Sequence, residues 1–146
     1  MLVPSRVQEV VREVAALVAP ACGHAKVNFR HYAPDGLNLT VDVENLRAAV
    51  LNLTLNAIEA AGPGGSVDLH ASGWDDGVRF EVVDSGPGPS ADLADSLFDA
   101  FVTSKPEGVG LGLAVVKRVA ADHQGTTSWI RDDACTRFRL DLPATE

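Results

Sequence analysis

Apolar residues recur every three or four positions near the start of the chain. Between Val7 and Val18 this spacing matches one face of an α-helix. Pro20 and then Gly23 interrupt the pattern, and both residue types commonly end a helix. We therefore expect an amphipathic helix that stops near residue 20, preceded by an irregular lead-in over residues 1–5.

Two segments of alternating apolar and polar residues follow. In residues 26–32, Val27, Phe29 and His31 alternate with polar residues, and residues 37–43 carry leucine or valine at every second position. Alternation with a period of two is typical of a half-buried β-strand. A Pro-Asp-Gly sequence at residues 34–36 predicts a turn that joins these two strands.

The remaining chain predicts two further helices and two hairpins. In order, they are a helix over residues 44–61 that ends at Gly62, strands 66–73 and 78–84, a helix over 111–123, and strands 126–131 and 136–142. Between the first hairpin and the last helix lies a long loop, residues 86–110, with three prolines and four glycines. Loops of this length in a compact domain are usually functional.

Composition limits the kind of protein that this chain forms. Its 146 residues suit a single domain over residues 1–146. The formal net charge of -8 argues against nucleic-acid binding, which needs a basic face. Cys22 and Cys135 form no CxxC pair, and the sequence shows neither a signal-like start nor an eighteen-residue apolar run. We expect a cytoplasmic domain without direct membrane contact.

Two asparagines in the predicted helix 44–61 are candidates for binding. Asn52 and Asn56 are four residues apart, so both amides lie on one helix face together with Glu59. Asparagine is unfavourable inside a helix, because its amide competes with the backbone for hydrogen bonds. Capping or simple solvent exposure explains one such residue more easily than two.

Asp84 ends a predicted strand and is followed by Ser-Gly-Pro-Gly. Glycines there allow the loop backbone to approach a flat ligand closely. A carboxylate in this place accepts a hydrogen bond from the N6 amine of adenine, whereas guanine presents a carbonyl oxygen at the same edge. Taken alone, however, these residues fit an ordinary turn after a strand.

Glycines also alternate along residues 108–112, directly before the last predicted helix. Such glycines leave backbone N–H groups and the positive end of a helix free to meet phosphate oxygens. The sequence contains no GxxxxGK[ST] motif, which excludes a P-loop. Gly86, Gly88 and Ala91 match GxGxxA, but Pro87 and Pro89 interrupt the loop where a dinucleotide-binding helix would begin.

In this order, the segments resemble the ATP-binding domain of histidine kinases, in the superfamily shared with gyrase and the heat-shock chaperone. Residues 52–57 resemble the N box, 84–88 the G1 box, 97–101 with 103–105 the F box, and 108–113 the G2 box. The resemblance covers nearly the whole chain. It implies an α/β two-layer sandwich, with a mixed, mostly antiparallel sheet packed against helices and ATP bound between helices and a lid.

The resemblance also implies roles for individual residues. Asn56 would ligate Mg²⁺, Asn52 would support the metal and the phosphates, and Lys105 would reach the phosphate tail from the lid. Asp84 would read adenine N6. The backbone that approaches the nucleotide would comprise Gly86, Gly88, Gly108, Gly110, Leu111 and Gly112. Glu59 stands where many relatives have a lysine directed at phosphate, so the source of phosphate neutralisation stays partly open.

Asn52 distinguishes between branches of that superfamily. In the hydrolytic branches this position usually holds a glutamate that takes a proton from water, and an amide cannot act as that base. The resemblance therefore implies a protein-histidine kinase that passes the terminal phosphoryl group of ATP to a histidine on a separate dimerisation domain. None of the four histidines here lies in a segment like that phosphoacceptor, so we expect a monomeric fragment, inactive alone, whose parent kinase serves a response regulator.

Two alternatives remain. One is a regulatory serine kinase of the anti-sigma type with the same fold, and the other is a domain that binds ATP without transferring phosphate. The opening helix and strand pair before Asn52 fit the sensor kinases better than the anti-sigma factors. Asn56, Asp84 and Gly110 argue against loss of catalysis.

Overall fold

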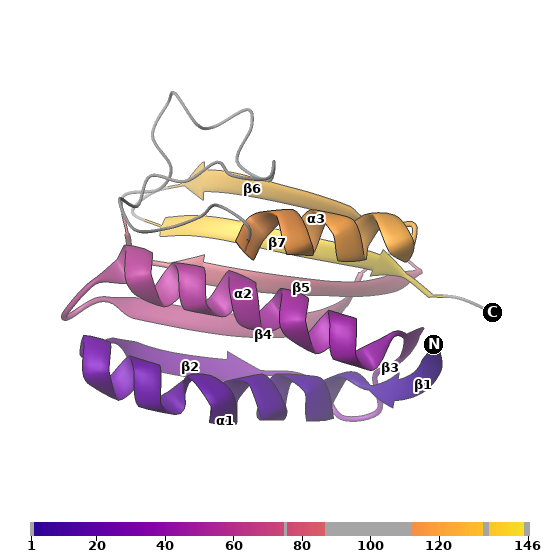
Figure 1. Cartoon of the computed structure of the whole chain (residues 1–146), viewed down its shortest axis with the longest axis horizontal. Helices are drawn as coiled ribbons and strands as arrows, with labels where there is room; N and C mark the ends of the chain where they lie inside the picture. The colour runs from indigo at the N-terminus through magenta and orange to yellow at the C-terminus, as the bar shows by residue number, and fades with distance from the viewer. Residues whose placement is uncertain (1, 75, 87–111, 133–134, 145–146) are drawn as a thin grey trace.

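The computed structural model describes residues 2–74, 76–86, 112–132 and 135–144. Three helices lie on one face of a five-stranded sheet, so the described chain forms two layers (Figure 1). The helices are α1 (Val7–Ala25), α2 (Val43–Ala61) and α3 (Gly112–Asp122). The two-layer α/β architecture expected from the resemblance is confirmed.

The main sheet has the strand order β2-β4-β5-β7-β6. Its strands are β2 (Asn28–Tyr32), β4 (Ser66–Trp74), β5 (Gly77–Asp84), β7 (Cys135–Pro143) and β6 (Thr126–Asp132). Only β2 and β4 are parallel, and the three other pairs are antiparallel. The sheet is therefore mixed and mostly antiparallel, and both predicted hairpins at its centre and edge are confirmed.

The first strands are paired differently from the sequence prediction. Residues 1–5 are not an irregular lead-in, because β1 (Val3–Arg6) pairs antiparallel with β3 (Asn38–Val41) in a separate two-stranded sheet. The turn at residues 34–36 therefore does not join two neighbours of one sheet. The prediction was wrong here because alternation shows that a strand is half-buried but does not show which strand it pairs with.

Helix α1 continues past the proline that was expected to end it. Pro20 lies inside the helix, which reaches Ala25 and ends where Lys26 adopts the left-handed conformation with φ 59. Pro20 removes one backbone hydrogen bond to the carbonyl of Ala16, and both residues are exposed, so water can satisfy that carbonyl. Burial of Cys22 continues the apolar face beyond the proline.

Hydrophobic side chains fill the space between the helices and the sheet. Val14, Leu46 and Leu53 come from α1 and α2, and they meet Leu69 and Phe80 from β4 and β5 in one continuous cluster. Burying one such side chain stabilises the fold by roughly 1.5–3 kcal/mol. This core fixes the position of α2 over the sheet.

His123 connects the end of α3 to the beginning of α2. Its Nε2 accepts a hydrogen bond of 3.0 Å from the backbone N–H of Asp42, the residue that caps α2. Its Nδ1 lies 2.8 Å from the carbonyl oxygen of Val119, one turn earlier in α3. The two helices are thereby held together at one end by a buried side chain.

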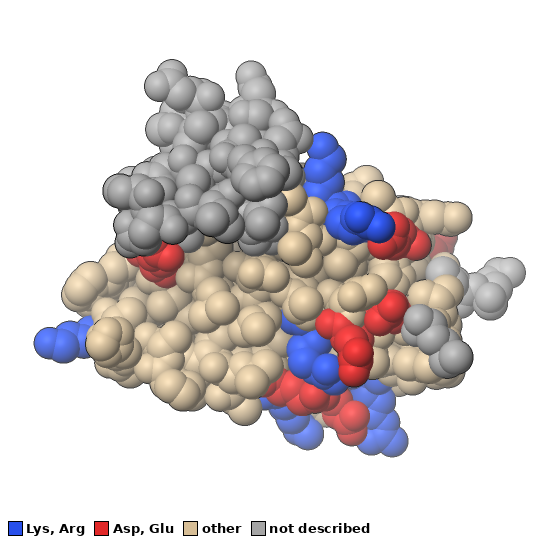
Figure 2. Space-filling model, viewed as in Figure 1, with Lys and Arg blue, Asp and Glu red and all other residues tan. Residues whose placement is uncertain are grey.

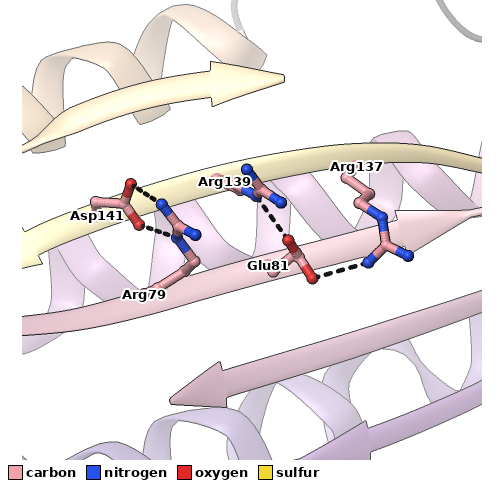
Figure 3. Close-up of polar contacts among 5 residues, drawn as sticks. All are labelled: Arg79, Glu81, Arg137, Arg139 and Asp141. Carbon is pink, nitrogen blue, oxygen red and sulfur yellow. Dashed lines mark hydrogen bonds and ion pairs between the residues drawn. The ribbon is translucent and has the colours of Figure 1, made fainter. Parts of the chain in front are cut away.

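Charged side chains lie on both faces of the molecule. The open face of the sheet carries ion pairs between neighbouring strands, in which Arg79 contacts Asp141 at 2.7 Å and Glu81 contacts Arg137 at 3.1 Å and Arg139 at 2.7 Å (Figure 3). On the helical side, charged side chains gather over the first half of α1 and beside α3 (Figure 2). The surface over the second halves of α1 and α2 is largely uncharged (Figure 2).

Candidate nucleotide-binding site

Helix α2 carries the two candidate asparagines near its middle. Asn52 and Asn56 are both half-buried, and the helix continues for another turn beyond them to Ala61. The Nδ2 of Asn52 donates a hydrogen bond of 2.8 Å to the carbonyl oxygen of Ala48 in the same helix. This bond uses one of the two N–H groups of the amide, so Asn52 can offer Oδ1 and the second N–H group to a ligand. Amide oxygens are among the ligands that Mg²⁺ accepts.

The turn after β5 lies against the last turns of α2. A Cβ atom built on Gly86 would stand 2.4 Å from the carbonyl oxygen of Ala60, which shows how closely the two backbones approach. Ala60 follows Asn56 by one helical turn, a rise of about 6 Å. The fold thus brings the turn after Asp84 close to the asparagine face of α2.

Asp84 is the most unusual polar residue of this site. It ends β5 on the inner face of the sheet, and only 1% of its surface is exposed. Its Oδ1 accepts a hydrogen bond of 2.8 Å from the backbone N–H of Gly86. Its Oδ2 is buried and has no hydrogen-bond partner within the described part of the chain. A buried acceptor without a partner is costly in a folded protein, and it is a natural place for a ligand N–H group.

The environment of Asp84 also shifts its ionisation. Burial raises the pKa of the carboxyl above its usual value of 3.8, while the hydrogen bond from Gly86 and the positive charge of Arg131 act in the opposite direction. This raised pKa means that the protein environment alone disfavours the ionised carboxylate. A ligand that donates a hydrogen bond to Oδ2 would favour the ionised form.

This shift predicts a pH-dependent contribution to stability. Because the pKa of Asp84 is higher in the folded state, its contribution is fully present below pH 3.8 and is lost as pH rises through the raised pKa. Asp84→Asn removes the titration. As pH rises above 3.8, the wild type should lose stability that the variant keeps, so the free energy of unfolding of the variant should rise relative to that of the wild type. Chemical denaturation at a series of pH values measures this difference. A difference that does not vary with pH would contradict the buried carboxylate.

Two residues beside Asp84 were missed in the sequence. Thr136 is buried in β7 directly opposite Asp84, and Arg131 of β6 lies opposite Thr136 on the other side of β7. The Nη1 of Arg131 donates hydrogen bonds to Thr136 Oγ1 at 2.8 Å and to the carbonyl oxygen of Gly86. The sequence could have indicated Thr136, because it is a polar residue in phase with the apolar Phe138 on the inner face of β7. No local signal indicates Arg131, whose contacts depend on the register of the hairpin.

Five residues of the predicted site lie outside the described residues. These are Gly88, Lys105, Gly108, Gly110 and Leu111. Gly112 is the first residue of α3, so a helix does begin directly after the alternating glycines, as predicted. Among the described residues, no three His, Cys, Asp or Glu side chains gather as a metal site. Mg²⁺ commonly binds through only one or two protein oxygens together with substrate phosphates, which Asn56 with a nucleotide would satisfy.

Comparison with known proteins identifies the family. Residues 41–146 match the family described as histidine kinase-, DNA gyrase B- and HSP90-like ATPases. The chain belongs to this family. The match begins at the end of β3 and includes α2, the turn after β5 and α3, which are the elements that build the site.

Relatives within this ATPase family are sensor kinases. The chain is 40% identical over 111 residues to sensor histidine kinase ZraS of Escherichia coli K12, an alignment of 75% of this chain and 24% of ZraS. It is 36% identical over 116 residues to the sensory histidine kinase/phosphatase NtrB of Rhodobacter capsulatus, covering 70% of this chain and 32% of NtrB. The chain thus spans about a quarter to a third of these relatives.

Solved structures of the family confirm the fold. The nucleotide-free catalytic domain of histidine kinase ThkA superposes with a TM-score of 0.90 at 26% identity, covering 100% of this chain and 99% of that domain. Full-length ShkA in complex with AMPPNP gives a TM-score of 0.88 at 32% identity, covering 99% of this chain and 32% of ShkA. The chain is therefore an ATP-binding catalytic domain of the histidine-kinase type. Within the described residues, no helix is both long enough and apolar enough to span a membrane.

Proposed function

We propose that this ATPase-family domain binds ATP with Mg²⁺ between α2 and the turn after β5, and passes the terminal phosphoryl group to a histidine on a separate dimerisation domain. Its continuous hydrophobic core supports one domain over the length of the chain. Its two free cysteines agree with a cytoplasmic location. The response regulator would be served through the full-length kinase.

The buried Oδ2 of Asp84 is the observation that carries this proposal. It is an acceptor without a partner in the described part of the chain, at a turn where Gly86 keeps the backbone close to α2. The N6 amine of adenine supplies the missing donor. Guanine would place a carbonyl oxygen against the same carboxylate, so the site favours adenine over guanine.

The phosphates would lie toward the middle of α2. Asn56 would offer an amide oxygen to Mg²⁺, and Asn52 would orient its Oδ1 through the bond from Nδ2 to Ala48. When bound, the nucleotide supplies the phosphoryl group and the metal ion neutralises its charge. Lys105 and the glycines Gly108, Gly110 and Gly112, with Leu111, would complete the phosphate contacts, and Gly88 would let the loop pass over the base.

The amide of Asn52 disfavours transfer of the phosphoryl group to water. An amide cannot take a proton from a water molecule, so this position does not activate water as a nucleophile. A histidine supplied by another domain would serve instead. That the relatives ZraS and NtrB are named as histidine kinases favours histidine over the serine of the anti-sigma alternative.

A calorimetric titration of ATP with Mg²⁺ into the domain tests this function. We expect saturable binding without continuing heat, because the amide of Asn52 cannot act as the base that activates water. Repeating the titration with GTP tests the preference for adenine, and we expect binding at least tenfold weaker, about 1.4 kcal/mol. Steady turnover would overturn the role of Asn52, and absence of ATP binding would overturn the proposal.

A further inference from the structure

Arg131 makes a contact that ties the edge of the sheet to the turn after Asp84. It lies in β6 opposite Thr136 of β7, which in turn lies opposite Asp84 of β5. Its Nη1 reaches across β7 and donates to both Thr136 Oγ1 and the carbonyl oxygen of Gly86. One guanidinium nitrogen of β6 is therefore bonded both to β7 and to the turn after β5.

The hydrogen bond from Arg131 also helps to hold the Gly86 peptide in place. The N–H of Gly86 is held by Asp84 Oδ1 at 2.8 Å, and its Cα lies so close to Ala60 that a Cβ atom would not fit. Arg131 holds the carbonyl oxygen on the other side. Because its N–H, Cα and carbonyl oxygen are each constrained, Gly86 is held in one position. That position orients the Asp84 carboxylate through the bond to Oδ1.

Arg131 also supplies charge where the site needs it. Its positive charge acts to lower the pKa of the Asp84 carboxyl, which burial raises, and so favours the ionised form. An ionised Asp84 is an acceptor at both oxygens, so it can hold Gly86 and a ligand amine at the same time. The geometry and the charge of Arg131 thus support the same state of the carboxylate.

We propose that Arg131 is a positioning residue for adenine recognition, holding the Gly86 peptide so that Asp84 presents Oδ2 to the base. It acts through Gly86 and Asp84 and needs no contact with the nucleotide. This inference rests on the proposed function, because it assumes that Asp84 reads adenine.

A double-mutant cycle between Arg131 and Asp84 tests the inference by calorimetric titration with Mg-ATP. Arg131→Met should weaken ATP binding by about fivefold to tenfold in the wild-type background, but by less than about twofold when Asp84→Asn is already present. Arg131→Lys keeps a charged donor and should recover most of the affinity. Arg139→Met is the matched control, because Arg139 pairs with Glu81 on the open face of the sheet, and it should leave ATP affinity unchanged (Figure 3).

The outcomes separate this inference from the function on which it rests. No ATP binding by the wild type would overturn the proposed function itself. Normal wild-type binding with an unaffected Arg131→Met variant would overturn only the role of Arg131. Equal losses with and without Asp84→Asn would show a general structural effect and would also overturn that role. Should Arg131→Met not fold, the same cycle with Arg131→Gln decides between these outcomes.

Discussion

Asp84→Asn weakens ATP binding by more than tenfold, about 1.4 kcal/mol, when measured by calorimetric titration in the presence of Mg²⁺. The asparagine can keep its Oδ1 on the N–H of Gly86, because that contact needs only an oxygen. Its Nδ2 then takes the place of the buried Oδ2 and presents N–H groups to the N6 amine of adenine. A donor faces a donor, and the hydrogen bond that the ligand should satisfy is lost.

Asp68→Asn is the matched control for this substitution. Asp68 lies in β4 of the same sheet, but on the open face, where it pairs with Arg30 at 2.9 Å. The same loss of one carboxylate there should leave ATP affinity unchanged and lower the free energy of unfolding only slightly, because Arg30 is largely exposed. Equal ATP affinity for Asp84→Asn and Asp68→Asn would refute adenine recognition by Asp84.

Gly86→Ala disrupts both the binding site and the fold around it. The new Cβ would stand 2.4 Å from the carbonyl oxygen of Ala60 and 2.9 Å from Asp84 Oδ1. The first of these atoms belongs to the backbone of α2, so relief requires the turn or the helix end to move. We expect the free energy of unfolding to fall by about 1–3 kcal/mol and ATP affinity to fall by more than tenfold. Chemical denaturation and calorimetric titration measure the two effects.

Gly23→Ala provides the comparison at a site with space. Gly23 lies within α1, and a Cβ atom there would meet no heavy atom within 4 Å. Alanine is the better helix residue, so this variant should gain up to about 1 kcal/mol of stability. Its ATP affinity should not change. If Gly86→Ala behaved like Gly23→Ala, the close approach between the turn and α2 would not matter for function.

Local patterns in the sequence predicted most of the elements that build the site. Helix α2 was expected over residues 44–61 and forms over Val43–Ala61, because its apolar spacing and the terminal Gly62 agree. Likewise, β4 and β5 follow their alternation to within two residues of the prediction. These signals suffice because each depends on residues that are neighbours along the chain.

Such local patterns do not predict which distant segments of the chain pair with each other. The extension of α1 through Pro20 depends on the burial of Cys22, and the separate sheet of β1 with β3 depends on partners more than thirty residues apart in the chain. A local pattern does not specify such a partner. Thr136 could have been noticed as a polar residue in a buried phase, but the contact from Arg131 to Gly86 joins residues 45 positions apart.

By itself, the sequence determined which residues are candidates for binding a nucleotide. The amides of Asn52 and Asn56 share a face because a helix has a fixed period, and Asp84 ends a strand because alternation stops there. Only the tertiary structure decided which hydrogen-bond partners the Asp84 carboxylate has. Packing of the sheet against α2 buried its carboxylate, Gly86 and Arg131 fixed one side of the turn, and Oδ2 was left without a partner in the described chain. The reason is that solvation and hydrogen bonding of a buried group depend on neighbours distant in sequence, whereas helix and strand periodicity depend on the chain's own geometry.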